Sequence, residues 1–355
     1  MSVTVIEATA QNQQEWDTYC TSHCAFYAQH WFWHDTLKKL GFTPISLMAR
    51  DRKNNMAGIF RAAILKMPLH RYAISTQADG RMAGGPLCSS EEASTALLRK
   101  FDGICRESHV AKAVIMAGVL GSNTPFWKES VESLGFKEQD KGKCSFVLDL
   151  EQGGSEAVFA NMSRRLRNRI RKGEKKGLRI REVRRTDDVK KYFTLKVKTW
   201  NMLGNLCPRS GEFDVLSHNI LTYGKMYIAE VEDKPVGGAY CYIDQNCWHL
   251  KGAVRLEQYD NYEINKAVFW RLITDAEKSG VRYIDFGSTA INSTHYTLKK
   301  SFQAQPFPLL WYEKTYHPLS IKLRNSLIHL SFKWYAPLSF KYSYALNPLT
   351  KWYEE

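Results

Sequence analysis

The chain has 355 residues, enough for about two domains, and its 44% hydrophobic and 24% charged residues allow each domain to bury a core. This composition excludes a disordered chain, and no run approaches the roughly 20 consecutive apolar residues of a membrane-spanning helix. The net charge of +14 at pH 7 indicates an anionic partner, and phosphate is the obvious anion.

The first ten residues contain Glu7 and no basic, apolar leader, so we expect no secretory signal and a cytoplasmic protein. The eight cysteines are scattered without a C-x-x-C pair, which predicts free thiols in a reducing compartment. Cys20, His23, Cys24 and His30 lie close together in the sequence, but their spacing fits no zinc template. We therefore expect no metal site.

Two halves of the chain carry the same order of secondary-structure signals, which predicts an internal duplication. Apolar runs joined by turn residues predict β-hairpins, and apolar residues three and four apart predict helices. The first half is predicted to run helix, strand, strand, helix, strand, short helix and strand over residues 27–40, 44–50, 57–65, 93–107, 113–118, 126–136 and 144–150. The second half is predicted to contain strands 225–231, 236–242 and 247–253, helix 264–278, strand 283–287, short helix 296–302 and strand 308–313.

This order predicts a mixed α/β (α+β) fold with two domains, each a central mixed sheet flanked by helices. We place the domains at residues 1–150 and 151–315, followed by an aromatic, basic C-terminal tail at 316–355. At the junction, two glycines break the strand and Ser155 is expected to cap the next helix. That helix is predicted to be a single one, because four apolar residues at spacings of three and four form one stripe. They are Phe159, Met162, Leu166 and Ile170.

The strongest charge signal lies between Ser163 and Lys191, where fourteen Lys and Arg residues stand against four Asp and Glu, a net charge of +10. Four of these cations are candidates for binding the phosphates of a donor or of a lipid-linked acceptor, since guanidinium groups bind phosphate bidentately. They are Arg167, Arg169, Arg171 and Lys172. The alternative is a solvated helix face, which is the usual role of a run of charges.

The C-terminal tail interleaves aromatic residues with Lys333, Lys341 and Lys351, which is typical of a surface that lies at a membrane interface. This interpretation predicts a peripheral protein on the anionic inner face of the membrane. Two alternatives stay open: the aromatic residues pack on the second domain, or they stack on the bases of an RNA such as tRNA.

Glycine-rich phosphate loops, nucleophile elbows and H-E-x-x-H metal helices are absent from the sequence. Three other segments carry a family resemblance through their order and spacing: the basic run 165–177, the strand end 283–288 and the segment 298–303. They resemble R-N-x-I-R-K-A-E-K-x-G, a strand ending in D-F-G, and F-K-x-x-F-G in the FemAB/FemX-like aminoacyltransferases and related acyltransferases of the GNAT superfamily. In this chain Leu298 and Gln303 replace the Phe and Gly of the family.

The resemblance implies two GNAT-like domains in tandem and an enzyme that transfers an acyl or aminoacyl group to an amine. It implies acyl-CoA or aminoacyl-tRNA as donor, no tightly bound cofactor, and a cell-envelope or lipid-linked precursor as a candidate acceptor. The usual GNAT pyrophosphate loop is missing after strand 247–253, which argues against an ordinary acetyl-CoA enzyme. The rival interpretation is a non-catalytic RNA- or membrane-binding protein on a GNAT-like scaffold.

In the resemblance, Lys299 falls on the lysine that stabilises the oxyanion of the tetrahedral intermediate, a task worth about 3–4 kcal/mol. The alternative is a solvated lysine on a short basic helix. Asp285 ends an apolar strand, where it either orients the attacking amine or caps the next turn. Gly287 lets the chain leave the strand beside the substrate, and the same motifs place Phe286 and Phe302 at the substrate.

Overall fold

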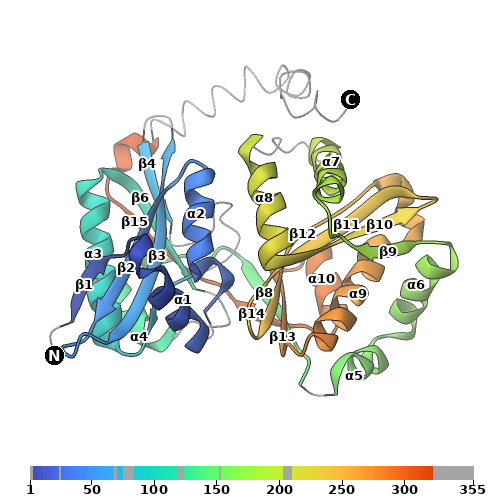
Figure 1. The fold of residues 1–355 in the computed structure, drawn as a ribbon, viewed down its shortest axis with the longest axis horizontal. Coiled ribbons are helices and arrows are strands. Elements are labelled where there is room, and N and C mark those ends of the chain that lie inside the picture. The colour runs from blue at the N-terminus through green and yellow to red at the C-terminus, as the bar shows by residue number, and fades with distance from the viewer. Residues whose placement is uncertain are drawn as a thin grey trace. The chain divides into compact units, whose positions relative to one another are not determined.

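The computed structural model describes residues 3–23, 25–67, 70–74, 84–117, 124–151, 153–202 and 210–322. These residues form two units, each built around its own mixed sheet (Figure 1). Of the described residues, 3–145, 288–291 and 307–322 belong to the first unit, and 146–287 and 292–306 belong to the second. Helices flank both sheets, which confirms the predicted mixed α/β fold.

The sheet of the first unit has the strand order β1-β2-β3-β4-β6-β15-β7, with β5 paired to β3. β4 and β6 are parallel, and the other described neighbours are antiparallel. The strands are β1 (Thr4–Glu7), β2 (Thr43–Arg50), β3 (Met56–Met67), β4 (His70–Ile74), β5 (Leu87–Cys88), β6 (Val110–Ala117), β7 (Lys137–Glu138) and β15 (Leu310–Thr315). The helices are η1 (Ala10–Asn12), α1 (Gln13–Ser22), η2 (Tyr27–Gln29), α2 (Trp31–Lys39), α3 (Glu91–Glu107) and α4 (Thr124–Ser133).

Both faces of this first sheet are buried, because its strands point apolar side chains alternately to either side. On one face Phe60 of β3 packs in the core beneath α3 and α4. On the other face Ile59 packs with Trp16 of α1 and Trp31 of α2 (Figure 1). Alternation along β3 places Arg61 on this second face, so a guanidinium is buried under α1 and α2.

The sheet of the second unit has the order β14-β8-β13-β12-β11-β10-β9. β12 and β13 are parallel, whereas β9, β10, β11 and β12 pair in antiparallel fashion. The strands are β8 (Lys143–Asp149), β9 (Arg179–Glu182), β10 (Gly224–Val231), β11 (Lys234–Ile243), β12 (Cys247–Arg255), β13 (Tyr283–Ala290) and β14 (Gln305–Pro308). The helices are α5 (Gly154–Asn161), α6 (Arg164–Lys175), α7 (Thr186–Met202), α8 (Ser210–Tyr223), η3 (Glu257–Tyr262), α9 (Ile264–Lys278) and α10 (Thr294–Ser301).

The last strand of each half lies in the sheet of the other half. β8 follows the elements of the first unit, yet it pairs between β13 and β14 of the second sheet, and β15 pairs between β6 and β7 of the first. The predicted strands 144–150 and 308–313 are therefore present, but each pairs in the sheet of the other half. Packing explains the exchange: Tyr312 of β15 is fully buried against Trp127 of α4, and Phe146 of β8 packs against Tyr296 of α10.

The predicted single helix after the junction is two helices, α5 and α6. Met162 is extended between them, and the side chain of Ser163 accepts the N–H of Leu166, so Ser163 begins a new helix. The cap of α5 is Gly153, which has a φ of +83°. The expected cap, Ser155, instead donates its backbone N–H to the carboxylate of Glu277 at 3.0 Å.

The predicted C-terminal tail lies mostly outside the described residues, which end at 322. At its start, the hydroxyl of Tyr316 donates to Oδ1 of Asp102 at 2.5 Å, which fastens this residue to α3. Lys333, Lys341, Lys351 and the aromatic residues around them all lie outside the described part. Among the described helices, none is both long and apolar enough to cross a membrane.

Candidate active site

The second sheet forks at its centre, between β12 and β13. The two strands pair over only three residues, and the last pair is His249 with Asp285. Both strands then continue separately, β12 to Arg255 and β13 to Ala290. Because ligands of α/β sheets bind beyond the carboxyl ends of parallel strands, this fork is where a substrate site is expected.

Asp285 and Lys299 both lie at the fork, and each is only 7% exposed. Oδ1 of Asp285 accepts the N–H of Gly287 at 2.8 Å, and the carbonyl of Gly287 accepts a hydrogen bond from Nζ of Lys299 at 2.7 Å. Gly287 has a φ of +73°, and a Cβ atom there would lie 3.1 Å from the carbonyl oxygen of Leu250, so the position requires glycine. Asp285 thus caps this turn, and Lys299 is a buried cation on α10 that reaches back to it.

His249 is a residue of the fork that the sequence analysis did not single out. Its ring is fully buried, with Nε2 2.5 Å from Oδ2 of Asp244 and Nδ1 3.4 Å from Oδ2 of Asp285. Burial opposes protonation, but the negative charges and hydrogen bonds of the Asp244 and Asp285 carboxylates raise the pKa of His249 well above its ordinary value. The fork therefore contains an imidazolium between two aspartates.

A cavity of about 500 Å³ opens at the carboxyl end of β12, within the second unit. It lies among α6, the start of α9 and α10, and its basic lining residues outnumber the acidic ones. The charged lining residues are Arg165, Arg169, Arg255, Lys266, Asp260 and Glu263. Glu263 pairs with Lys266 at 2.5 Å and lies 3.5 Å from Arg169, and Asp260 pairs with Arg255.

The structure separates the four cations that the sequence grouped on α6. Only Arg169 lines the cavity. Arg167 caps the end of α5, with Nη1 donating at 2.7 Å to the carbonyls of both Ala160 and Met162, so its guanidinium serves the fold. Arg171 lies over the ring of Phe159 and, like Lys172, is exposed outside the cavity lining. Arg165, Arg255 and Lys266 line the cavity and were not singled out, because only the folded chain brings three elements together.

The two predicted substrate-binding phenylalanines are core residues. Phe302 is completely buried and Phe286 nearly so. Both pack against Phe269 of α9, with ring centroids 5.9 and 5.4 Å away. They hold α10 and β13 against α9, and neither lines the cavity.

His295 is a further lining residue that the sequence analysis missed. Partial burial, followed by the positive charges of Lys299 and Arg255, lowers the pKa of His295, so the imidazole is neutral at pH 7. His295 and Lys299 are four residues apart on α10 and therefore share one helix face. That spacing was visible in the sequence and is the signal by which His295 could have been found.

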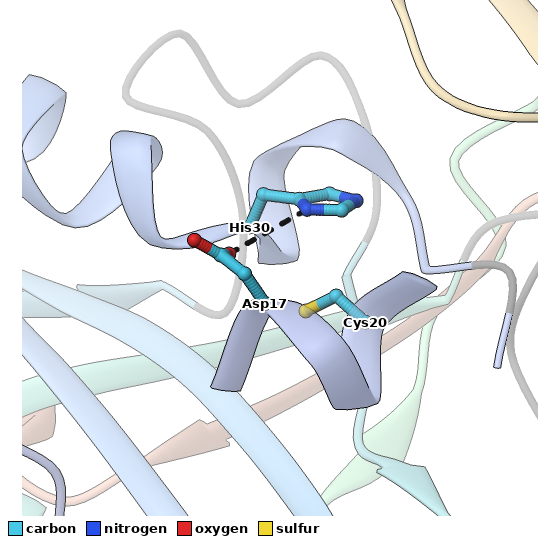
Figure 2. Close-up of side chains that lie close together, drawn as sticks. All are labelled: Asp17, Cys20 and His30. Atoms are coloured by element: carbon cyan, nitrogen blue, oxygen red, sulfur yellow. Dashed lines mark ion pairs between the residues drawn. The ribbon is translucent and has the colours of Figure 1, made fainter. Parts of the chain in front are cut away.

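Three side chains of the first unit have the chemistry of metal ligands (Figure 2). Asp17 and Cys20 project from α1 and His30 faces them, with all ligand atoms within 4.8 Å of one another. Asp17 already accepts the N–H of Trp31 at 2.7 Å. Burial raises the pKa of the Cys20 thiol, and the positive charge of buried Arg61 acts on the same group. A divalent cation would have to displace the proton of a buried thiol and would be repelled by the fixed positive charge of Arg61, so the cluster is better explained as a set of contacts that hold His30 against α1.

Residues 160–296 match the family model of the acetyltransferase (GNAT) domain. Over these residues the second unit is similar to the GNAT acetyltransferase domain. This match covers β9 to β13 and both sides of the fork, and it confirms the predicted acyltransferase class. No curated protein matches the sequence.

Solved structures with both halves of this fold extend the likeness beyond the GNAT domain. FemX is 15% identical, covers 90% of this chain and 99% of its own, and has a TM-score of 0.67. A tandem GNAT protein from the clavulanic acid biosynthesis pathway is 9% identical, with 88% and 98% covered and a TM-score of 0.58. The C-terminal domain of a protein assigned as a lysylphosphatidylglycerol synthetase from Agrobacterium fabrum is 12% identical, with 90% and 97% covered and a TM-score of 0.58. These likenesses confirm the predicted tandem GNAT fold and its resemblance to FemX.

Proposed function

We propose that this protein transfers an acyl or aminoacyl group from a phosphate-bearing donor to an amine, with the donor held in the cavity of the second unit. The observation that carries the proposal is the position of that cavity, at the fork of a GNAT domain and beside two groups suited to the chemistry. Those groups are the neutral imidazole of His295 and the buried ammonium of Lys299.

The donor site is supported by the charge and the size of the cavity. Four cations line it against two acids, which favours phosphate. A volume of about 500 Å³ suits a small acyl or aminoacyl group with its adjoining linker. The segment from Glu257 to Tyr262, where a GNAT pyrophosphate loop would lie, is a 3-10 helix that pairs Asp260 with Arg255. The donor phosphates would therefore be bound by side chains of α6 and α9.

The reaction needs one base and one cation at the fork. The acceptor amine attacks the carbonyl carbon, so that a C–N bond forms while a proton passes from the nitrogen to His295. The oxyanion of the tetrahedral intermediate is stabilised by the positive charge of the Lys299 ammonium, which also donates to the carbonyl of Gly287. Collapse then breaks the C–S bond of a thioester or the C–O bond of an aminoacyl ester. The leaving thiolate or alkoxide takes the proton back.

The acceptor we propose is an amine on a cell-envelope or lipid-linked precursor. FemX and the assigned lysylphosphatidylglycerol synthetase are among the structures with this fold, which supports this choice. The exposed cations of α6, Arg171 and Lys172 among them, are suited to an anionic surface, whether a tRNA or the inner face of a membrane.

Donor consumption by the purified protein tests this function. Acetyl-CoA and a mixed pool of aminoacyl-tRNA are offered separately with an amine acceptor, and mass spectrometry identifies any ligand retained through purification. Arg169→Gln should raise the KM of acetyl-CoA, because Arg169 lines the cavity, whereas Arg171→Gln on the same helix lies outside the cavity lining and should leave the KM of acetyl-CoA unchanged. Equal effects of the two variants would show that the donor does not bind in the cavity.

The second candidate function is a non-catalytic RNA- or membrane-binding protein, favoured by the net charge of +10 between Ser163 and Lys191. It predicts binding of tRNA or anionic vesicles without consumption of either donor. Binding that survives the loss of both His295 and Lys299, in a protein that never consumes a donor, would establish it in place of the enzyme.

A further inference from the structure

The inference concerns the imidazolium of His249 at the fork. His249 is the last residue of β12 that pairs with β13, and the strands separate immediately after it. One carboxylate partner, Asp244, precedes β12, and the other, Asp285, lies on β13. The ring therefore joins two segments at the point where the sheet opens.

The protonation state follows first from geometry. A neutral imidazole carries one N–H, yet both ring nitrogens of His249 face carboxylate oxygens, which are acceptors only. The other titratable groups near the ring are two thiols, Cys247 on β12 and Cys241 on β11. Burial raises the pKa of both thiols, to about 11 and about 12, so both are neutral at pH 7. Lys251, two residues further along β12, is the next cation on this strand and is also buried.

Hydrogen bonds connect this imidazolium to the proposed catalytic cation. Nδ1 of His249 contacts Oδ2 of Asp285, and Oδ1 of the same carboxylate accepts the N–H of Gly287. The carbonyl of Gly287 then accepts the hydrogen bond from Lys299. Each link is a group that is buried or lies on buried backbone, so a rotation of Asp285 would displace the carbonyl that holds Lys299.

We propose that His249 is a positioning residue for the transfer reaction: as an imidazolium it fixes Asp285, and thereby the Gly287 turn against which Lys299 is held. This role rests on the proposed function, because it presupposes that Lys299 takes part in the transfer.

Direct measurement of the His249 proton tests the first step of this proposal. The full-length protein is labelled at its histidines and titrated by NMR. Both ring nitrogens of His249 should carry protons at pH 7.5, and the midpoint should lie more than one pH unit above the usual value of about 6.5. His34, 9% exposed and hydrogen-bonded to Ser46, is the matched control. Burial and then Arg61 lower the pKa of His34 to about 4, so it should remain neutral. A neutral His249 at pH 7.5 would overturn the proposal.

Asp244→Asn should change the protonation state of His249 without removing the hydrogen bond that residue 244 accepts from Cys247. The amide oxygen can still accept the N–H of Cys247, as Oδ1 of Asp244 does at 2.8 Å, so the turn should fold. The amide NH₂ now faces Nε2 of His249, which favours a neutral ring. The His249 midpoint should fall by at least one pH unit, and the unfolding equilibrium constant should lose its roughly tenfold rise per pH unit above pH 7. Asp140→Asn is the control, since Asp140 likewise accepts a backbone N–H, that of Gly142, but in an exposed turn of the first unit.

Kinetics then separate positioning from mere stability. Asp244→Asn should lower kcat by about 10–100-fold with the KM of the donor unchanged, because the donor site is intact while Lys299 is misplaced. The Asp140→Asn control should keep both constants. An unchanged kcat in Asp244→Asn would refute this role alone. Absence of transfer by the unaltered protein would refute the proposed function and this role with it, whatever the NMR titration shows.

Discussion

Replacing Lys299 by Met tests the centre of the proposed site, because the two side chains share an apolar stem and differ in the charged head. The ammonium of Lys299 donates to the buried carbonyl of Gly287 at 2.7 Å, so the variant leaves this carbonyl without that donor. An unsatisfied buried acceptor costs about 1–3 kcal/mol, and a unit of this size loses about 2–4 °C of Tm per kcal/mol. We therefore expect the Tm to fall by about 2–12 °C.

Turnover should fall further than stability alone explains. Loss of one oxyanion donor costs about 10²–10³-fold in kcat, measured as donor consumption well below the Tm of the variant. The neighbouring Lys300 is exposed, so Lys300→Met should cost less than about 0.5 kcal/mol and leave kcat unchanged. A lower Tm with normal turnover would mean that Lys299 only holds the Gly287 turn. Equal effects at both lysines would refute the whole argument.

Three other outcomes follow from particular contacts. Arg167→Gln should lower the free energy of unfolding, measured in urea, by about 1–3 kcal/mol, because it removes two charged hydrogen bonds from the end of α5. Arg171→Gln should lower it by less than about 1 kcal/mol, and equal losses in the two variants would contradict the capping role. The pKa of His34 is lowered to about 4 in the folded protein, so His34 takes up a proton more readily in the unfolded chain. Its contribution to the free energy of unfolding is therefore fully present above pH 6.5 and is lost as the pH falls. From pH 7 to 5 the unfolding free energy should drop by about 2 kcal/mol more in the natural protein than in His34→Gln, and equal drops would refute this. Arg165→Gln should reduce the slope of log K for tRNA binding against log salt concentration by about one. An unaltered slope would show that Arg165 does not contact the tRNA.

Local patterns predicted the elements of the fold well, because turn residues and apolar periodicity act over short distances. The hairpin between β10 and β11 is an example, since Glu232 and Asp233 adopt the positive φ values that such a tight turn requires. The helix after the junction shows the limit of periodicity. Apolar spacing from Phe159 to Ile170 continues unbroken across Ser163, although the cap there starts a second helix.

The candidate site was only partly readable for a related reason. Lys299, Asp285 and Gly287 were found because motifs mark them, and the structure gathers them at the fork. Motifs do not say which way a side chain turns, so Arg167 could not be told from Arg169 on the same helix. His249 depends on the register that pairs it with Asp285, thirty-six residues further along the chain, and no local pattern encodes that register.

The exchanged strands determine when each sheet can be completed on the ribosome. β6 can pair with β15 only after β15 has been synthesised. At about 5–20 residues per second the ribosome needs roughly 10–40 s to pass from Ala117 to Leu310. Throughout that interval the edges of β6 and β7 expose unpaired backbone groups, which are templates for pairing with other chains. A nascent chain therefore depends on rapid synthesis or on chaperone cover at this stage.

Because of the same exchange, each half of the sequence contains a strand that completes the sheet of the other half. If the chain were cut between residues 150 and 151, neither fragment could fill its own sheet: one would still contain β8, and the other would still contain β15. Such fragments should be poorly folded when expressed apart and should recover their structure when mixed. Each unit therefore contains one strand that the other half of the sequence supplies.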